Sequence, residues 1–441
     1  MMFGPAAIPM LWFIAKMLWG EYHKRPPLWV SYAPDALPEV SFLPNVCGIH
    51  RPETFQNCED IRVFGDYAVV SCDPYRRQSN LLTGYKPGTP SGSVYVWNWV
   101  EDSEPVRLDV GGATDFRPQG VRVWPLGEPG QKIDTVDYSV FVDTVRLFIA
   151  NNSKNGSVEV LDYTFSTGAS EHVASLRHKD GTIDPAHVLP VSSSEVFLTN
   201  TLGYPGGVLG RLELLSATPL ATIGYLNFTD MTNITAKNVG AVTTPTGIDY
   251  ANGKMYVASA LYGVHAYELY VPPATLTAEE IAANSSLGRM RFLPGEKFHR
   301  MPYLPTTLSY SRELGGLVTT AMTGYVAEAK ALFGKPQAPS WAGLLVESDN
   351  LVVADSVTAA LKTDERKWQT LFYDADGASF SGLSSLVVEN GKRFGVGRYQ
   401  DGVMICNSNG IEEVELPPAP PAAKTKKAVE IDGMFLTKDE L

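Results

Sequence analysis

The sequence repeats one pattern of short strands and turns six times. Its clearest copy, TGIDYANGKMYVASALYGVHAY over residues 246–267, predicts a strand, an Asn-Gly turn, a second strand, a short loop and a third strand. Residues 386–406 follow the same plan with another Asn-Gly turn. With the looser copies included, the first strands are expected to begin near positions 60, 119, 187, 247, 307 and 386. A repeat of roughly sixty to eighty residues constrains the fold more than any single motif.

Repeated units of about four short antiparallel strands predict blades arranged around an axis, because radial repetition protects the edges of the sheets. We therefore expect an all-β fold, a six-bladed β-propeller over residues 46–415. A pair of β-sandwiches would not require six evenly spaced copies. The innermost strand of each propeller blade begins at one face of a central tunnel, so the residues that open these strands should converge on one cavity.

The composition supports this fold and excludes several functions. The 441 residues include 39 Gly and 31 Pro, which suits many tight turns, and a hydrophobic fraction of 44% argues against disorder. An excess of 48 acidic over 36 basic residues argues against a nucleic-acid binder. The motifs G-x-S-x-G, H-E-x-x-H, the phosphate loop and the dinucleotide glycine pattern do not occur, which excludes typical serine hydrolases, zinc proteases and nucleotide-binding enzymes.

Both ends of the chain carry targeting signals. Residues 2–20 are apolar except for Lys16, which predicts a hydrophobic helix over 1–20 that acts as a signal peptide or signal anchor and can associate with a membrane. A buried core helix is the alternative. A linker over 21–45 would lead into the propeller. The tail over 416–441 begins with a Pro-rich stretch and ends in KDEL, which the retrieval receptor of the endoplasmic reticulum recognises.

Other features bear on the compartment of the folded body. The basic residues at 23–25 would place it in the cytosol by the positive-inside rule. The KDEL tail opposes this, as do the N-x-S/T sequons, which are more numerous than the roughly two expected from composition. The predicted glycosylation sites are Asn151, Asn155, Asn227, Asn233 and Asn284. We therefore expect a glycoprotein of the endoplasmic reticulum lumen.

The four cysteines permit three disulfide pairings. Cys47, Cys58 and Cys72 lie near the start of the folded body, and Cys406 lies near its end. If the fold closes into a ring, a bond between Cys47 and Cys406 would join the first strand to the last and leave Cys58 with Cys72. Buried thiols without a disulfide are the alternative. The cysteines show no zinc-ligand spacing.

Residues 43–406 resemble the serum paraoxonase and arylesterase family, to which the propellers of strictosidine synthase and gluconolactonase are related. The matching segments are LPNVC (43–47), CED (58–60), FRPQG (116–120), LFIANN (147–152), LRHK (176–179), FLTNT (197–201), 246–268 and the VMIC that ends at Cys406. The resemblance implies a bond between Cys47 and Cys406 and an uncleaved N-terminal helix. It also implies calcium-dependent hydrolysis of esters, lactones and phosphotriesters.

The calcium ligands of that family are mostly replaced. Glu59 and Asp60 match the first-blade pair and would be the metal ligands if calcium is retained. The remaining ligand positions fall on Ala186, His187, Thr246, Thr306 and Thr307, and the family's histidines fall on Gln119 and Asn152. One carboxylate pair is too little charge for tight calcium binding, and neither Gln nor Asn can act as a base. We therefore expect no required cofactor.

The tunnel residues give the candidate site. Glu59 and His187 are the candidate catalytic residues, since burial in a narrow cavity should raise the pKa of the Glu59 carboxyl. A structural role is the alternative for both. Five residues could bind a substrate through hydrogen bonds or simply fill the tunnel floor. They are Gln119, Asn152, Thr246, Thr306 and Thr307.

The expected function is an enzyme on a paraoxonase-like scaffold. It would bind a small, largely apolar molecule in the tunnel and promote a metal-independent cyclisation or condensation in specialised metabolism, for which strictosidine synthase is the precedent. One alternative is a calcium-dependent arylesterase or lactonase. The other is a lumenal propeller that binds a molecule without changing it.

Overall fold

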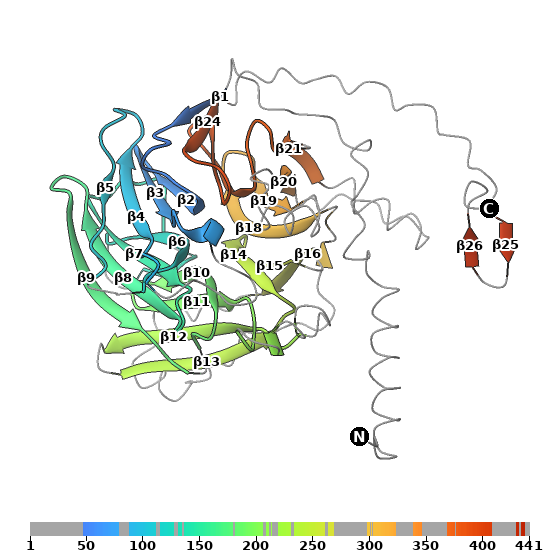
Figure 1. Cartoon of the computed structure of the whole chain (residues 1–441). Helices are drawn as coiled ribbons and strands as arrows, with labels where there is room; N and C mark the ends of the chain where they lie inside the picture. Colours follow the sequence, from blue (N-terminus) through green and yellow to red (C-terminus); the bar gives the residue numbers. More distant parts are fainter. Residues whose placement is uncertain are drawn as a thin grey trace. The chain divides into compact units, whose positions relative to one another are not determined.

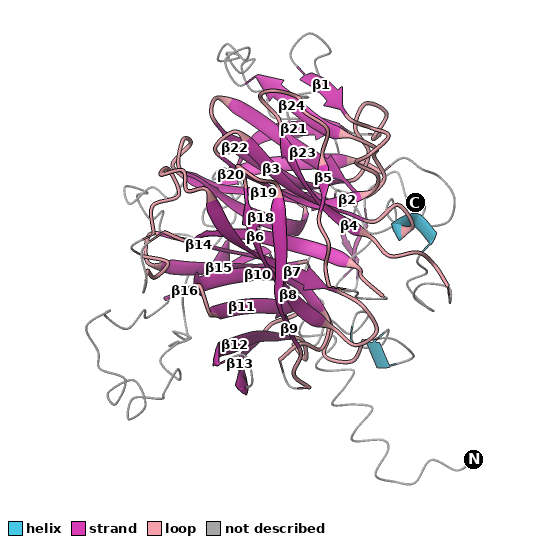
Figure 2. Ribbon diagram, turned by 90° about the vertical axis from the view of Figure 1, so that its left-hand side faces the viewer, coloured by secondary structure: helices cyan, strands magenta, loops and turns pink. Residues whose placement is uncertain are grey.

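The computed structural model describes residues 47–407 with gaps, together with 429–431 and 434–436 of the tail. The gaps are 79–87, 112–114, 128–130, 135, 180, 206–208, 211–212, 214–218, 231–232, 261–262, 269–297, 300, 302, 323–337, 346–367 and 375. The described body consists almost entirely of strands and loops (Figure 2). Its sheets fan out around a common centre (Figure 1).

Six sheets of four antiparallel strands form the blades. Blade 1 contains β2 (Cys58–Phe64), β3 (Tyr67–Cys72), β4 (Ser93–Asn98) and β5 (Val106–Arg107), with a 3-10 helix at Arg76–Gln78 after β3. Blade 2 contains β6 (Pro118–Pro125), β7 (Thr144–Asn151), β8 (Ser157–Thr164) and β9 (Ala169–Leu176). Blade 3 contains β10 (Pro185–Ser192), β11 (Glu195–Asn200), β12 (Thr222–Asp230) and β13 (Asn233–Ala241).

The remaining blades follow the same order. Blade 4 contains β14 (Pro245–Ala251), β15 (Lys254–Ser259), β16 (Gly263–Glu268) and β17 (Phe298–His299). Blade 5 contains β18 (Leu304–Ser311), β19 (Gly316–Met322), β20 (Ser340–Leu345) and β21 (Trp368–Asp374). Blade 6 contains β22 (Leu383–Glu389), β23 (Lys392–Gly397), β24 (Val403–Asn407) and β1 (Cys47–His50). The predicted six-bladed propeller is confirmed.

Blade 6 closes the ring by combining the two ends of the body. β1 pairs with β24, and Cys47 lies directly opposite Cys406 in the register. Figure 1 shows this blue strand beside the orange-red end of the propeller. A disulfide joins these two cysteines, and a second one joins Cys58 of β2 to Cys72 of β3. The pairing that a closed ring favours is therefore the one present.

The innermost strands share one irregularity at their first residues. β2, β6, β10, β14, β18 and β22 contact one another in a circle and line the tunnel. Each has a register shift against its neighbour within four residues of its start. After the shift comes a fully buried aliphatic residue that packs between blades. These residues are Ile61, Val121, Val188, Ile248, Leu308 and Leu386. The shift turns the preceding polar side chains toward the tunnel.

The two ends of the chain are less completely described. In the tail, β25 (Val429–Ile431) pairs with β26 (Met434–Leu436), a hairpin that the sequence did not predict. The predicted N-terminal helix over 1–20, the linker over 21–45, the Pro-rich stretch and the KDEL residues lie outside the described residues. No helix within the described part is long and apolar enough to cross a membrane.

Replacing both Cys47 and Cys406 with Ser should lower the free energy of unfolding by about 2–5 kcal/mol. Because this bond ties the first described strand to the last strand of the ring, amide hydrogen exchange should rise first in β1 and β24. Chemical denaturation and exchange mass spectrometry measure the two effects. The control is the Cys58→Ser/Cys72→Ser variant, in which exchange should rise in blade 1. An unchanged denaturation midpoint in the first variant would contradict a closing function for the bond.

Candidate functional site

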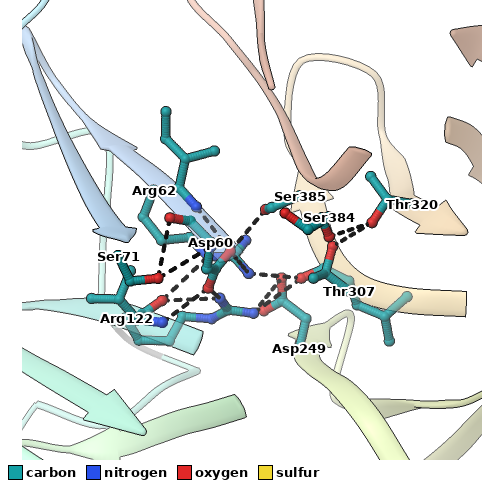
Figure 3. A network of polar contacts seen from close by, with 12 residues as sticks. Asp60, Arg62, Ser71, Arg122, Asp249, Thr307, Thr320, Ser384 and Ser385 are labelled. Atoms are coloured by element: carbon teal, nitrogen blue, oxygen red, sulfur yellow. Dashed lines mark hydrogen bonds and ion pairs between the residues drawn. The ribbon is translucent and has the colours of Figure 1, made fainter. Parts of the chain in front are cut away.

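Asp60 is the centre of a polar network that joins blades 1, 2, 4, 5 and 6 (Figure 3). Its side chain is fully buried near the start of β2. Oδ1 accepts hydrogen bonds from the Ile61 N–H at 3.0 Å and from the Ser385 hydroxyl of blade 6 at 2.8 Å. Oδ2 accepts one from the Val121 N–H of blade 2 at 2.9 Å. One carboxylate therefore connects blades 6, 1 and 2.

Two arginines cross the tunnel beside Asp60. Arg62 Nη2 lies 3.2 Å from Asp60 Oδ1 and donates to the Leu308 carbonyl of blade 5 at 3.0 Å. Arg122 Nη1 lies 3.4 Å from Asp60 Oδ2. Arg122 Nη2 donates to the carbonyls of Ile248 at 2.7 Å and Leu308 at 3.0 Å. The guanidinium groups thus satisfy backbone carbonyls that the innermost strands direct into the tunnel.

Asp249 completes this group, which we call the central plug: Asp60, Arg62, Arg122 and Asp249. Asp249 Oδ2 lies 3.7 Å from Arg122 Nη2 and accepts the Tyr310 N–H at 2.7 Å. Burial alone would raise the pKa of Asp60, but the charges of Arg62 and Arg122 outweigh it and lower this pKa. Asp60 therefore stays ionised beside the two arginines at neutral pH.

The central plug does not fit a calcium site. Calcium takes about six to eight oxygen ligands, with carboxylates supplying the compensating charge. Both oxygens of Asp60 already face guanidinium groups and N–H or O–H donors. Among the described residues, no group of three or more His, Cys, Asp or Glu side chains is placed to hold a metal ion. Two arginines lie where a cation would have to bind.

Glu59 is held in an ion pair at the tunnel face. Its carboxylate is fully buried, and Arg398 Nε lies 2.9 and 3.0 Å from its two oxygens. Arg76 Nη1 lies 3.3 Å from Oε2. Burial alone would raise the pKa of Glu59, but Arg398 and Arg76 outweigh it and lower this pKa to about 2. The predicted rise in the pKa of Glu59 is wrong, because the two arginines keep it ionised.

Side chains at the tunnel face connect each blade to the next through a backbone carbonyl. Ser71 donates to Gln119, Asn152 to Pro185 at 3.2 Å, Thr199 to Thr246 at 2.9 Å, Thr246 to Pro305 at 3.0 Å, Thr306 to Ser384 at 3.2 Å and Ser384 to Cys58 at 2.9 Å. One such bond crosses every junction between blades. We call this circle the inter-blade ring.

The inter-blade ring uses most of the residues predicted to bind a substrate. The hydroxyls of Thr246 and Thr306 donate within it. Thr307 Oγ1 lies 2.8 Å from Thr320 Oγ1, which itself donates to Ser384 (Figure 3). These threonines are buried and hydrogen-bonded within the protein. A substrate-binding function for these threonines stays a prediction. Their hydrogen bonds within the protein agree with the alternative, that they fill the tunnel floor.

His187 differs from the other tunnel residues. It is 1% exposed, and neither ring nitrogen has a hydrogen-bond partner in the protein. Its ring packs on Gly120, where a Cβ would lie 2.5 Å from His187 Cδ2. Burial lowers the pKa of His187 to about 4, although the carboxylates of Asp60 and Glu59 act in the opposite direction. The imidazole is therefore neutral near pH 7, with one donor and one acceptor nitrogen.

Two half-buried polar residues, Asn152 and Asp184, meet at the same junction between blades 2 and 3. Asn152 Nδ2 donates to Asp184 Oδ1 at 2.7 Å, and Asp184 Oδ2 accepts the Leu202 N–H at 3.2 Å. The side-chain amide of Gln119 makes no hydrogen bond to another described residue. We call Asn152, Asp184 and His187 the blade 2–3 junction. Asp184 directly precedes β10.

The structure bears differently on the five predicted glycosylation sites. Asn151 is fully buried and donates to Ser157 at 3.1 Å and to Glu159 at 3.2 Å. A glycan on this amide is incompatible with the fold, so Asn151 is a wrong prediction. Asn155 is exposed in a turn, and Asn227 is half-buried in β12. The side chain of Asn233 and all of Asn284 lie outside the described part.

No protein-family model and no curated protein sequence matches this chain. Similar solved structures include a protein provisionally named a gluconolactonase, with 11% identity over 85% of this chain and 97% of that chain and a TM-score of 0.40. Another, from Bacteroides fragilis, is provisionally named a 6-phosphogluconolactonase, with 10% identity, 78% and 92% coverage and a TM-score of 0.39. The Malassezia sympodialis allergen Mala s 1 has 10% identity, 80% and 92% coverage and a TM-score of 0.41.

These comparisons carry no argument about function, because the identities and TM-scores are low. The propeller fold rests on the strand pairing described above. Propellers with gluconolactonase names are among the structural neighbours, whereas membership of the paraoxonase family is not shown.

Replacing Glu59 with Gln should destabilise the protein at neutral pH but not in acid. The folded-state pKa of Glu59 is about 2 against an ordinary value of 4.5, so its ion pairs stabilise the fold above pH 4.5 and are lost as the pH falls toward 2. The difference in unfolding free energy should be about 3 kcal/mol at pH 7. Denaturation of wild type and Glu59→Gln across this range measures it. A difference that does not change with pH would contradict the ion pair.

Proposed function

We propose that this chain is a propeller enzyme that binds a small, largely apolar molecule at the tunnel face. It promotes a cyclisation or condensation of that molecule without a metal ion, as a step of specialised metabolism. His187 is the observation that carries the proposal. Buried polar groups in proteins almost always have hydrogen-bond partners. The two ring nitrogens of His187 have none in the protein, so a polar group of the substrate would supply them.

The blade 2–3 junction gives the substrate its orientation. The neutral imidazole of His187 can donate to one substrate atom and accept from another. The Gln119 amide, on the innermost strand of blade 2 beside Gly120, is a further donor and acceptor without a hydrogen bond to another described residue. Holding a flexible molecule with its reacting groups in contact lowers the entropic part of the barrier. Orientation by neutral groups suits ring closure of an uncharged molecule better than hydrolysis by an activated water.

A non-catalytic binding propeller is the second candidate. The observation that favours it is the pairing of Glu59 and Asp60, since both carboxylates contact arginines and cannot readily take up a proton. A calcium-dependent arylesterase or lactonase is less well supported. Its metal would have to displace the arginines of the central plug and of Glu59.

The two disulfides support an oxidising compartment, because such bonds form and persist outside the cytosol. We accordingly propose that the folded body lies in the lumen of the secretory pathway. Retention in the endoplasmic reticulum through a receptor for the KDEL residues remains part of this proposal.

Replacing His187 with Ala should lower substrate conversion while the propeller remains folded. The probe is the small-molecule extract of cells that lack this chain, incubated with purified protein and followed by liquid chromatography and mass spectrometry. His265→Ala is the matched control, because His265 is a half-buried histidine whose pKa is also lowered but which lies in β16. Conversion should fall by roughly tenfold or more in the first variant only, since one buried hydrogen bond contributes about 1–3 kcal/mol. Equal conversion by both variants would contradict the proposed site.

Removal of calcium should leave this conversion unchanged. The wild-type protein is treated with a chelator, and conversion is compared before treatment, after it and after calcium is restored. Loss of conversion that calcium restores, together with turnover of phenyl acetate or a lactone, would instead establish the calcium-dependent hydrolase. Binding of an extract component without conversion would favour the non-catalytic propeller.

A further inference from the structure

We propose that Asp184 is the proton-transfer residue of this site, accepting a proton from a substrate hydroxyl or amine and returning it to the product. The proposal rests on the proposed function and names the acid–base group that it requires. Glu59, the carboxylate predicted for this task, is already paired with Arg398 and Arg76. A carboxyl group that exchanges protons near neutral pH needs a different environment.

Asp184 has that environment. Its oxygens accept hydrogen bonds from the Asn152 amide and the Leu202 N–H, which are both neutral donors. No Arg or Lys side chain contacts it among the described residues. In contrast, Asp60 and Glu59 each contact two arginines, and Asp249 contacts Arg122. Unlike Asp60, Glu59 and Asp249, the Asp184 carboxyl group has no positively charged side chain in contact with it in the described part.

Its position places it at the junction between blades 2 and 3. Asn152 bridges the two blades by donating both to Asp184 and to the Pro185 carbonyl. Asp184 as a residue is half-buried, at the start of blade 3. The His187 ring follows three residues later and packs on Gly120 of blade 2. Asp184, Asn152 and His187 thus belong to one junction, which gives a substrate hydrogen bonds and a proton acceptor together.

The electrostatic surroundings agree with this geometry. Burial raises the pKa of Asp184 to about 6. The hydrogen bonds from Asn152 and Leu202 act in the opposite direction, and the negative charge of Glu213 raises the pKa further. Glu213 lies on the connection between β11 and β12, where it accepts the N–H groups of Gly203 and Tyr204. Among the described residues, it is the charged group that acts on Asp184.

The proposed step is the addition of an O–H or N–H group of the substrate across its own C=O or C=N bond. As the new C–O or C–N bond forms, the Asp184 carboxylate takes the proton from the attacking group. The π electrons of the C=O or C=N bond move to its oxygen or nitrogen, which then receives the same proton from Asp184. No atom is gained or lost and nothing is oxidised, so substrate and cyclic product have equal mass.

The test compares wild type with Asp184→Asn, which keeps an oxygen acceptor for Leu202 but cannot carry the proton. Purified proteins are incubated with the small-molecule extract of cells that lack this chain. Wild type should convert a component into an isomer of equal mass, with a rate that rises as the pH increases through about 6. Asp184→Asn should be slower by about a hundredfold or more, and Asp184→Glu should restore part of the rate.

The Glu213→Gln variant is a second test, because a purely structural function of Asp184 predicts no change in the pH profile of conversion. Removing the negative charge beside Asp184 should move the midpoint of the pH profile to lower pH while conversion is kept. Conversion by Asp184→Asn at the wild-type rate, or a wild-type profile without a midpoint near 6, would overturn the assignment of Asp184 but leave the proposed function standing. A wild-type protein that converts no component would overturn both.

Discussion

The backbone N–H and C=O groups at the centre of the propeller need hydrogen-bond partners beyond their own sheets. Innermost strands converge there and direct N–H and C=O groups into the tunnel, where an unpaired group would be costly. Asp60 accepts the Val121 N–H, while Arg62 and Arg122 donate to the carbonyls of Ile248 and Leu308. The central plug therefore supplies hydrogen-bond partners to backbone groups of several blades and links those blades to one another.

One consequence concerns where chemistry can occur. Charged groups on the axis are committed to one another, as are the hydroxyls of the inter-blade ring. The imidazole of His187, at the blade 2–3 junction, is a buried polar group without a hydrogen-bond partner in the described part of the protein. A propeller of this kind can bind and orient a neutral molecule near its tunnel face, although its centre is closed by ion pairs.

The sequence predicted the fold well because its signals are local. Asn-Gly turns and alternating strands repeat at similar spacing, and ring closure follows from Cys47 and Cys406 at the two ends of the repeats. The site was less predictable because its contacts are distant. Arg398 reaches Glu59 across 339 positions and reverses the expected pKa shift. Neither the burial of Asn151 nor the neutral surroundings of Asp184 could be recognised before the blades were assembled.

The most direct test of the central claim is a double-mutant cycle between Asp60 and Arg122. Unfolding free energies are measured for wild type, Asp60→Asn, Arg122→Met and the double variant. If the plug is a coupled ion pair, each single change should cost about 3–5 kcal/mol by leaving a buried charge unpaired, and the double variant should cost clearly less than the sum. Single costs that add within about 0.5 kcal/mol would show that the two side chains act independently, which would contradict the account.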